Sequence, residues 1–265
     1  MLTKMRKRIK QLWFLLRGYK PWVPAQRYPD DIFLVSYPKS GSTWLRFMLA
    51  SYVLGEKCDF RNVHDIIPDI HMNPNQCAHI ARPRIIKSHM RYESTYENVI
   101  YLVRDGRDVA VSYYFHAQKY DGIDQSVPFA QYLEWFNKGI GIEYGSWGSH
   151  VLSWLNHAPE RLLLVHYEDL KQQPHIELER VLTFIGLPVN TAQVTMAVEA
   201  AAFERMQSLE KDQRTFADGF KQSVSTIRFV RKGQVGGWAD YFDEQQLSHF
   251  LDVHGQAMRR LGYLS

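Results

Sequence analysis

The sequence has few cysteines and no long apolar run, and both shortages narrow the kind of protein it encodes. Only Cys58 and Cys77 occur among its 265 residues. Two cysteines do not make the disulfide framework of a small secreted domain, so a reduced, cytoplasmic setting is expected. No stretch approaches the ~18 apolar residues that a membrane-spanning helix needs. Repeats and long Gly/Ser linkers are absent too, which favours one globular domain with at most an appendage.

An excess of charge of one sign is also lacking. The chain has 32 Lys and Arg against 28 Asp and Glu, a formal net charge of +4. A nucleic-acid coat needs basic residues clustered on one face, so we expect no nucleic-acid partner and a small anionic ligand instead. The hydrophobic fraction of 45% and the aromatic fraction of 14% supply a substantial core.

Residues 1–20 form a basic, amphipathic segment that we separate from a main domain at 21–265. The apolar run Leu12–Leu16 is too short for a signal peptide, and Arg17 interrupts it. One helical face would carry Ile9, Leu12, Trp13 and Leu16. This face is expected to pack on the domain, and contact with a membrane surface stays as the alternative.

Strand-like and helical patterns alternate along the rest of the chain. The strand-like stretches are 31–36, 84–87, 98–103 and 162–165. The helical stretches are 43–54, 108–118, 128–138, 146–156, 174–185, 190–204 and 243–261. This alternation predicts an α/β fold with a central parallel sheet flanked by helices and a ligand at the carboxyl ends of the strands. Residues 55–83 and 207–237 lack clear periodicity, and loops of this length in a compact domain are usually functional lids or partly disordered.

The loop Tyr37–Trp44 (Y-P-K-S-G-S-T-W) lies between an apolar strand and a helix. Backbone N–H groups and the helix dipole favour an anion at such a junction. Lys39 adds a cation and the hydroxyls add donors. We therefore expect a phosphate-like ligand here. The loop is not a Walker A motif, because Lys39 comes two residues before Gly41 instead of after the second glycine.

The loop resembles the 5′-phosphosulfate loop of the sulfotransferases, which use 3′-phosphoadenosine 5′-phosphosulfate (PAPS) and release the 3′,5′-bisphosphate PAP. The resemblance spans roughly residues 30–262 and implies a P-loop-like, PAPS-binding domain. It assigns donor contacts to Lys39, Ser40, Gly41, Ser42, Thr43 and Trp44.

A second match runs from Val99 to Ser112, where an apolar strand ends in Arg104. The motif is similar to the family's 3′-phosphate motif, and it implies that Arg104 and Ser112 hold the ribose phosphate. An arginine fork suits phosphate oxygens. Two alternatives are open: Arg104 pairs with a nearby aspartate, or Asp105 is a Walker B acid that holds Mg²⁺ in a P-loop kinase.

The segment Phe229–Trp238 resembles the family's C-terminal R-K-G-x-x-G-x-W pattern. This likeness implies that Arg231, Lys232 and Gly233 complete the 3′-phosphate clamp, whereas a solvated basic turn is the alternative. The match of Tyr167 to a Tyr-Glu-Asp-Leu motif, together with Trp44 and Phe203, implies an adenine site. Where relatives often have Thr-Ser-Phe, this chain has Ala201-Ala202-Phe203.

The stretch Ile85–His89 matches the family's strand followed by Lys-Thr-His. By this resemblance His89 is the general base, and an imidazole near its normal pKa suits that task. Lys39 would stabilise the leaving phosphate oxygen, and Lys87 would contact the sulfuryl group. The remaining histidines show no metal-ligand spacing, so no metal is expected.

The family's acceptors are varied, and we expect a small molecule, first a natural product and second a glycolipid or carbohydrate. The candidate pocket aromatics are Tyr92, Phe115, Tyr120, Trp135, Tyr144 and Trp147. The segment Asp243–Leu247 departs from the family's Lys-Thr-Val dimerisation segment, so dimerisation in that mode is not expected. A non-catalytic nucleotide-binding or membrane-surface module is a further alternative to the enzyme.

Overall fold

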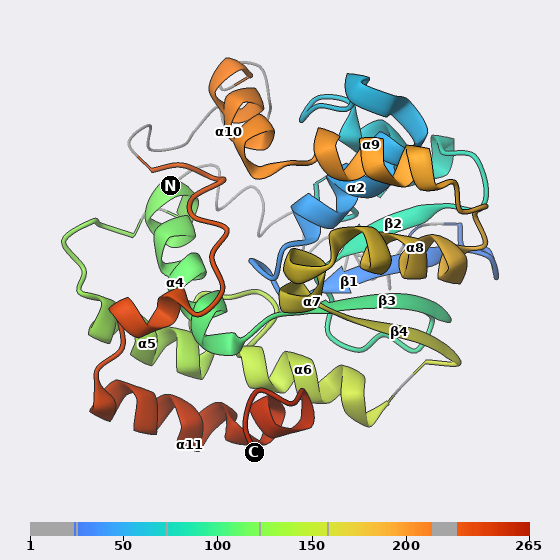
Figure 1. The fold of residues 1–265 in the computed structure, drawn as a ribbon. Helices are drawn as coiled ribbons and strands as arrows, with labels where there is room; N and C mark the ends of the chain where they lie inside the picture. The colour runs from blue at the N-terminus through green and yellow to red at the C-terminus, as the bar shows by residue number, and fades with distance from the viewer. Residues whose placement is uncertain (1–23, 25, 73, 122, 158, 214–226) are drawn as a thin grey trace.

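Four parallel strands form the centre of the molecule (Figure 1). The computed structural model describes residues 24–265 except 25, 73, 122, 158 and 214–226. The strands are β1 (Ile32–Ser36), β2 (Ile85–Ser88), β3 (Asn98–Val103) and β4 (Arg161–His166). Their order is β2-β1-β3-β4. The predicted α/β class and the four predicted strands are therefore confirmed. The amphipathic segment 1–20 lies outside the described residues.

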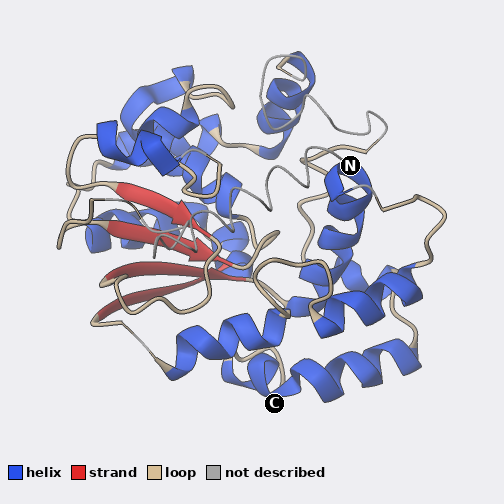
Figure 2. Ribbon diagram, turned by 180° about the vertical axis from the view of Figure 1, so that it is seen from behind, coloured by secondary structure: helices blue, strands red, loops and turns tan. Residues whose placement is uncertain are grey.

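Helices cover both faces of the sheet (Figure 2) because the strand side chains alternate between two cores. Ile32 and Leu34 point into a core shared with helices α2, α8 and α9, and Phe33 and Val35 into one shared with α4, α5, α6 and α11. The helices of the first core are α2 (Ser42–Leu54), α8 (Pro174–Ile185) and α9 (Thr191–Ala200). Those of the second are α4 (Gly106–His116), α5 (Phe129–Lys138), α6 (Trp147–Asn156) and α11 (Glu244–Arg260). The two central strands, β1 and β3, are buried along their whole length and are apolar except for Ser36 and Asn98 at their ends.

The helix predicted over 190–204 is wrong as a single element. It is two helices, because α9 ends at Ala200 and α10 (Phe203–Asp212) begins three residues later. Ala202 is extended, with ψ of 147°. The indole N–H of Trp44 donates to the Ala201 carbonyl at 2.9 Å, so a side chain takes the acceptor that a continuing helix would use. The break turns Phe203 toward the strand ends.

Segment 55–83 contains more order than its sequence pattern indicated. It holds the short elements η1 (Gly55–Lys57), α3 (Val63–Ile66) and η2 (Pro74–His79). Between α3 and η2 the chain pairs with the edge of the sheet, where Asp69 forms a parallel bridge with Lys87 of β2. The backbone bonds are Lys87 N–H to the Pro68 carbonyl (2.9 Å) and Ile70 N–H to the Lys87 carbonyl (3.1 Å).

The strand order determines where a ligand binds. The chain leaves β1 for β2 on one side and reaches β3 on the other, so the connections diverge at the carboxyl ends of β1 and β3. Such a switch point leaves a crevice in open α/β sheets. The four strands end directly before the anion loop, His89, Arg104 and α7 (Tyr167–Gln172).

Candidate active site

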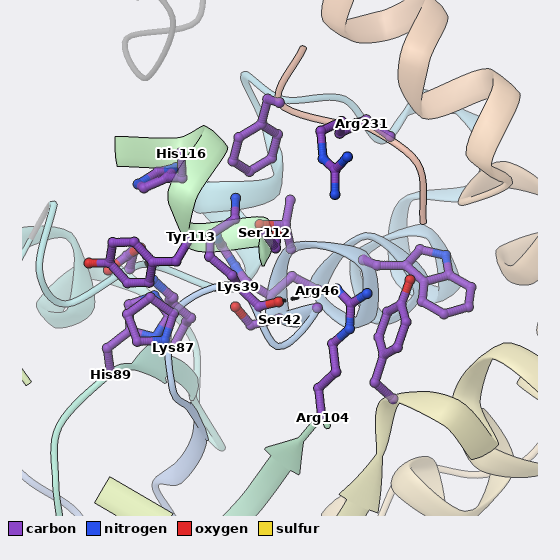
Figure 3. A pocket seen from close by; sticks show the side chains of 18 of the residues that line it. Lys39, Ser42, Arg46, Lys87, His89, Arg104, Ser112, Tyr113, His116 and Arg231 are labelled. Carbon is purple, nitrogen blue, oxygen red and sulfur yellow. Dashed lines mark hydrogen bonds and ion pairs between the residues drawn. The ribbon is translucent and has the colours of Figure 1, made fainter. Parts of the chain in front are cut away.

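A cavity of about 810 Å³ lies at these strand ends. It brings together residues that the sequence spreads over nearly two hundred positions. Among the predicted site residues it is lined by Lys39, Gly41, Ser42, Thr43, Trp44, Lys87, His89, Arg104, Ser112, Tyr167, Phe203, Arg231, Lys232 and Gly233. Ser40 is the exception, since its side chain is buried in the loop. In Figure 3, Arg104 rises from a strand end, Arg231 points toward it from the opposite side, and Lys39 lies between them and the Lys87–His89 group.

The loop at the start of α2 has the geometry of an anion site. Lys39 has a φ of 76° and Gly41 a φ of 101°, so both lie in the left-handed region. A Cβ on Gly41 would lie 2.5 Å from the Tyr167 ring. Two independent constraints therefore require glycine at position 41: the positive φ and the close approach of the Tyr167 ring. Helix α2 has no side-chain cap and no acid in its first turn, which leaves its first N–H groups available to an anion.

A second cationic centre lies across the cavity. The Arg104 guanidinium stacks 4.4 Å from the Tyr167 ring and donates to the Gln234 carbonyl at 2.8 Å. The predicted ion pair of Arg104 with an aspartate is present, to Asp108 at 3.5 Å. Arg231 lies 4.3 Å from the ring of Phe115. Burial lowers the pKa of Arg231, yet a guanidinium stays charged at neutral pH.

A buried polar atom at the second centre fits an anionic ligand. Arg104 Nε is buried and has no hydrogen-bond partner among the described residues. Buried donors are normally satisfied, so this atom is suited to an additional acceptor. Phosphate or sulfate oxygens are acceptors of this kind.

Two carboxylates that the sequence analysis did not assign hold the C-terminal strap, residues 227–238, over the cavity. Asp108 accepts the N–H groups of Gly236 and Trp238, both at 2.9 Å. Glu210 accepts those of Phe229 and Val230, at 2.6 and 2.9 Å. The strap is thereby tied to α4 and α10 on either side of Arg231. In the sequence, the only indication of these contacts was Asp108, an acid one helical turn after Arg104.

Aromatic side chains gather beside the anion loop. The rings of Trp44 and Tyr167 are 5.7 Å apart and inclined at 64°. Gly233 lies against this group, since a Cβ there would lie 2.9 Å from the ring of Phe203. Lys171, which the sequence analysis missed, places its ammonium 5.6 Å from the Trp44 ring. A planar base fits such walls by stacking.

His89 has a defined hydrogen-bonding state. Its Nδ1 lies 2.7 Å from the backbone carbonyl of Ser36, which can only accept. Nδ1 therefore carries the proton in the neutral ring, and Nε2 keeps the lone pair. Burial, followed by the charges of Lys87 and His71, lowers the pKa of His89 well below 6.5. The expectation of a near-normal pKa is thus wrong, and the ring is neutral at pH 7.

Lys87 is not a free cation. Its buried Nζ lies 2.5 Å from Asp69. Burial lowers the pKa of Lys87, and the Asp69 carboxylate opposes this. Burial alone would raise the pKa of Asp69, but the adjacent Lys87 ammonium holds it well below its usual range. The pair is charged, with part of the Lys87 donor capacity already used.

The predicted acceptor aromatics divide into two groups. Tyr120 and Tyr144 line the cavity, together with His64, His71 and His116. Phe115 stacks on Arg231. Trp135 and Trp147 pack in the core, and Tyr92 stacks on His157, so these three are wrong as pocket residues. Aromatic composition alone does not separate a pocket wall from a core.

The fold and this cavity place the chain among the open α/β proteins that have a binding crevice at the carboxyl ends of parallel strands. Residues 29–262 match the family model of the sulfotransferase domain. Sulfotransferase 1B1 of Mus musculus is 33% identical over 255 residues, which cover 88% of this chain and 84% of the relative. The chain belongs to the sulfotransferase family.

Solved structures agree with this assignment. Mouse sulfotransferase SULT7A1 complexed with PAP superposes with a TM-score of 0.69 at 28% identity, covering 88% of this chain and 86% of that one. Retinol dehydratase in complex with androsterone and PAP gives a TM-score of 0.71 at 21% identity, covering 92% and 85%, a likeness of fold alone. Within the described ranges, no helix has the length and apolar character to cross a bilayer.

Proposed function

We propose that this sulfotransferase moves the sulfuryl group of PAPS to a hydroxyl or amine of a small-molecule acceptor and releases PAP. The observation that carries the proposal is the presence of two separate anion centres on one cavity, the loop at Lys39 and the pair Arg104–Arg231. A nucleotide with phosphates on both its 3′ and 5′ sides needs two such centres. The PAP in the SULT7A1 structure supports the same donor.

The donor would lie across the cavity from one centre to the other. N–H groups of Gly41, Ser42 and Thr43, with Lys39, would hold the 5′ side, whereas the N–H of Ser40 already donates to the Tyr37 carbonyl at 3.2 Å. Arg104, Ser112, Arg231, Lys232 and the Gly233 backbone would hold the 3′-phosphate. Trp44, Tyr167 and Phe203 would enclose the adenine. Lys232 is the outermost member, since it is 44% exposed and pairs with Asp240 at 3.8 Å.

Transfer then requires an in-line arrangement of acceptor, sulfur and leaving oxygen, as in phosphoryl transfer. The S–O bond to the acceptor forms as the bond to the 5′-phosphate oxygen breaks. Nε2 of His89 would take the acceptor proton, and Lys39 would stabilise the charge on the leaving oxygen. Lys87 would contact the sulfuryl oxygens. In this proposal the lysines do the work of a metal, and no metal takes part.

The acceptor would occupy the part of the cavity beside His89, where Tyr144 and His71 lie. A natural product comes first and a glycolipid or carbohydrate second. The cytoplasm is the proposed location, in keeping with two unpaired cysteines. Nucleic acid is not a proposed partner, and contact of residues 1–20 with a membrane surface is the subsidiary alternative.

Two experiments test the proposal against a P-loop kinase. In thermal unfolding, PAP at a hundred times its Kd should stabilise the protein by ~2.7 kcal/mol, with Mg-ATP giving a small shift. A library of phenols, alcohols, amines and saccharides would then be screened with radiolabelled PAPS. Stabilisation by Mg-ATP alone, or no transfer to any acceptor class, would count against the proposed reaction.

A further inference from the structure

The sheet-edge segment around Asp69 carries side chains that meet those of β2 (Ile85–Ser88). Asp69 and Lys87 form a single isolated bridge, and the chain turns at residues 70–72 directly after it. The turn brings the ring of His71 against that of His89. Asp69 faces Lys87, and His71 faces His89. Asp69 and His71 of segment 55–83 therefore contact Lys87 and His89, the two residues of this region that the family resemblance assigns to catalysis.

Each of these two contacts is short and directional. Asp69 Oδ2 accepts the Lys87 ammonium at 2.5 Å. Nε2 of His71 accepts the backbone N–H of His89 at 2.6 Å. The rings of His71 and His89 are nearly parallel, with centroids 5.6 Å apart and an interplanar angle of 16°. Asp69 and His71 are also joined to each other, because the backbone N–H of His71 donates to the Asp69 carboxylate at 3.0 Å.

We infer that Asp69 and His71 are positioning residues for the transfer reaction. This inference rests on the proposed function and extends it to residues that the family motifs do not include. Asp69 fixes the ammonium of Lys87 at the cavity wall, and His71 fixes the main chain of His89. With its N–H held by His71 and its Nδ1–H held by Ser36, His89 keeps Nε2 as the proton acceptor.

The placement favours positioning over a purely structural role. A buried ion pair is a weak source of stability, and well-packed apolar residues commonly replace it without loss. This pair instead lies in the cavity wall, where Asp69, His71, Lys87 and His89 all line the same space. Catalysis is sensitive to small displacements of a base, so holding it from two sides has a direct kinetic consequence.

Variants of His71 separate positioning from other effects. His71→Gln keeps a side-chain acceptor for the His89 N–H, whereas His71→Leu removes it. We expect kcat to fall at least tenfold in His71→Leu and to stay within about threefold of wild type in His71→Gln. The Kd of PAP should stay within twofold in both. His79→Leu, an exposed histidine in η2 (Pro74–His79), is the matched control and should change neither quantity.

A spectroscopic measurement tests the same inference without an acceptor. In ¹⁵N-histidine NMR of the full chain, His89 should show the Nδ1-protonated neutral ring in wild type and in His71→Gln, and a mixture of tautomers in His71→Leu. His89→Asn assigns the signal. Asp69→Asn should lower kcat at least tenfold without weakening PAP.

Failure of the proposed transfer reaction and failure of the positioning role of Asp69 and His71 give different results. If wild type transfers no sulfuryl group to any acceptor while the NMR behaves as expected, the proposed function fails and the positioning geometry stands. If wild type is active and His71→Leu matches it in kcat and tautomer, the inference is overturned. Equal losses in His71→Gln and His71→Leu also overturn it, because the imidazole itself would then be required. If His71→Leu does not fold, the Asp69→Asn kinetics and the wild-type tautomer decide.

Discussion

At the scale of single residues, the anion site depends on a glycine that has no room for a side chain. Gly41 combines a φ of 101° with a Tyr167 ring 2.5 Å from its absent Cβ. Either constraint alone would favour glycine, and the second places the ring of Tyr167 directly against the loop. The motif located this residue from sequence, but the contact with Tyr167 required the fold.

Gly41→Ala should therefore lower the affinity for PAP tenfold or more, because the loop or Tyr167 must shift to make room for the added Cβ. The backbone strain alone costs about 1–3 kcal/mol of stability. Gly55→Ala at the other end of α2 is the matched control, because its φ is 67° with nothing within 4 Å of the added Cβ. Calorimetric titration with PAP should show a loss only in Gly41→Ala. Equal PAP affinity in both variants would contradict the close-approach argument.

His89 is the second residue whose role is decided locally. His89→Ala should lower kcat by a hundredfold or more, the scale of losing a general base. The affinity for PAP should be unchanged, because His89 lies on the far side of Lys39 from Arg104 and Arg231 (Figure 3). Single-turnover kinetics with radiolabelled PAPS gives the chemical step directly. Normal turnover in this variant would remove His89 from the mechanism.

At the scale of elements, the strap of residues 227–238 is held by contacts that the sequence motifs do not predict. The motif pointed to Arg231 and Gly233, yet what holds them is Asp108 on α4 and Glu210 on α10. Backbone N–H groups of a loop have no sequence signature, so their partners could not be assigned before the fold was known.

Asp108→Asn should weaken the binding of PAP about tenfold or more. Asparagine keeps only one oxygen and no charge, so one of the two bonds to the strap loses its acceptor and the other is no longer charge-assisted. Such bonds are worth about 1.5–3 kcal/mol each. Asp240→Asn, within η5 (Gly237–Asp240), is the control, since its exposed pair with Lys232 at 3.8 Å should contribute little. Titration calorimetry at fixed ionic strength measures both. Identical affinities in the two variants would show that the strap does not depend on Asp108.

The elements themselves were predictable where the apolar pattern was strong. Strands β1, β3 and β4 have unbroken apolar runs, and Gly186 ends α8 in the left-handed conformation that a C-terminal glycine favours. The failures have identifiable causes. A side-chain bond from Trp44 ends α9, and the pairing of Asp69 at the sheet edge depends on β2, which lies many residues away in the chain. Neither effect leaves a periodic pattern.

At the scale of the whole molecule, one sheet order explains why distant motifs converge. The order β2-β1-β3-β4 places the ends of all four strands on one edge. The two cationic centres follow β1 and β3, which are neighbours, and His89 follows β2 on the outer side. The proposed donor and acceptor compartments would therefore follow from the order of the strands.

Stability should depend on pH through histidines that are buried neutral. Burial lowers the pKa of His150 to about 3 and that of His254 to about 4. Below the unfolded pKa of ~6.5 the unfolded chain binds protons that the folded chain does not, so stability falls as pH falls. Between pH 7 and pH 5 each should remove up to about 2 kcal/mol.

His254→Leu tests this effect, because both ring nitrogens of His254 lack a hydrogen-bond partner among the described residues. The variant should flatten the pH dependence of the denaturation free energy without loss of stability at pH 5. Urea unfolding at pH 7, 6 and 5 provides the comparison. A slope equal to that of wild type would mean that His254 does not bind the extra proton on unfolding.

The central claim, a donor site with separate centres for a 3′ and a 5′ anion, is tested most directly by calorimetry with PAP and with adenosine 5′-phosphate. Two charge-assisted bonds of about 1.5 kcal/mol to the 3′-phosphate correspond to roughly a hundredfold in Kd. PAP should therefore bind at least a hundredfold more tightly than adenosine 5′-phosphate, and Arg104→Ala should remove most of that difference. Equal affinity of the wild-type protein for the two nucleotides would contradict the account.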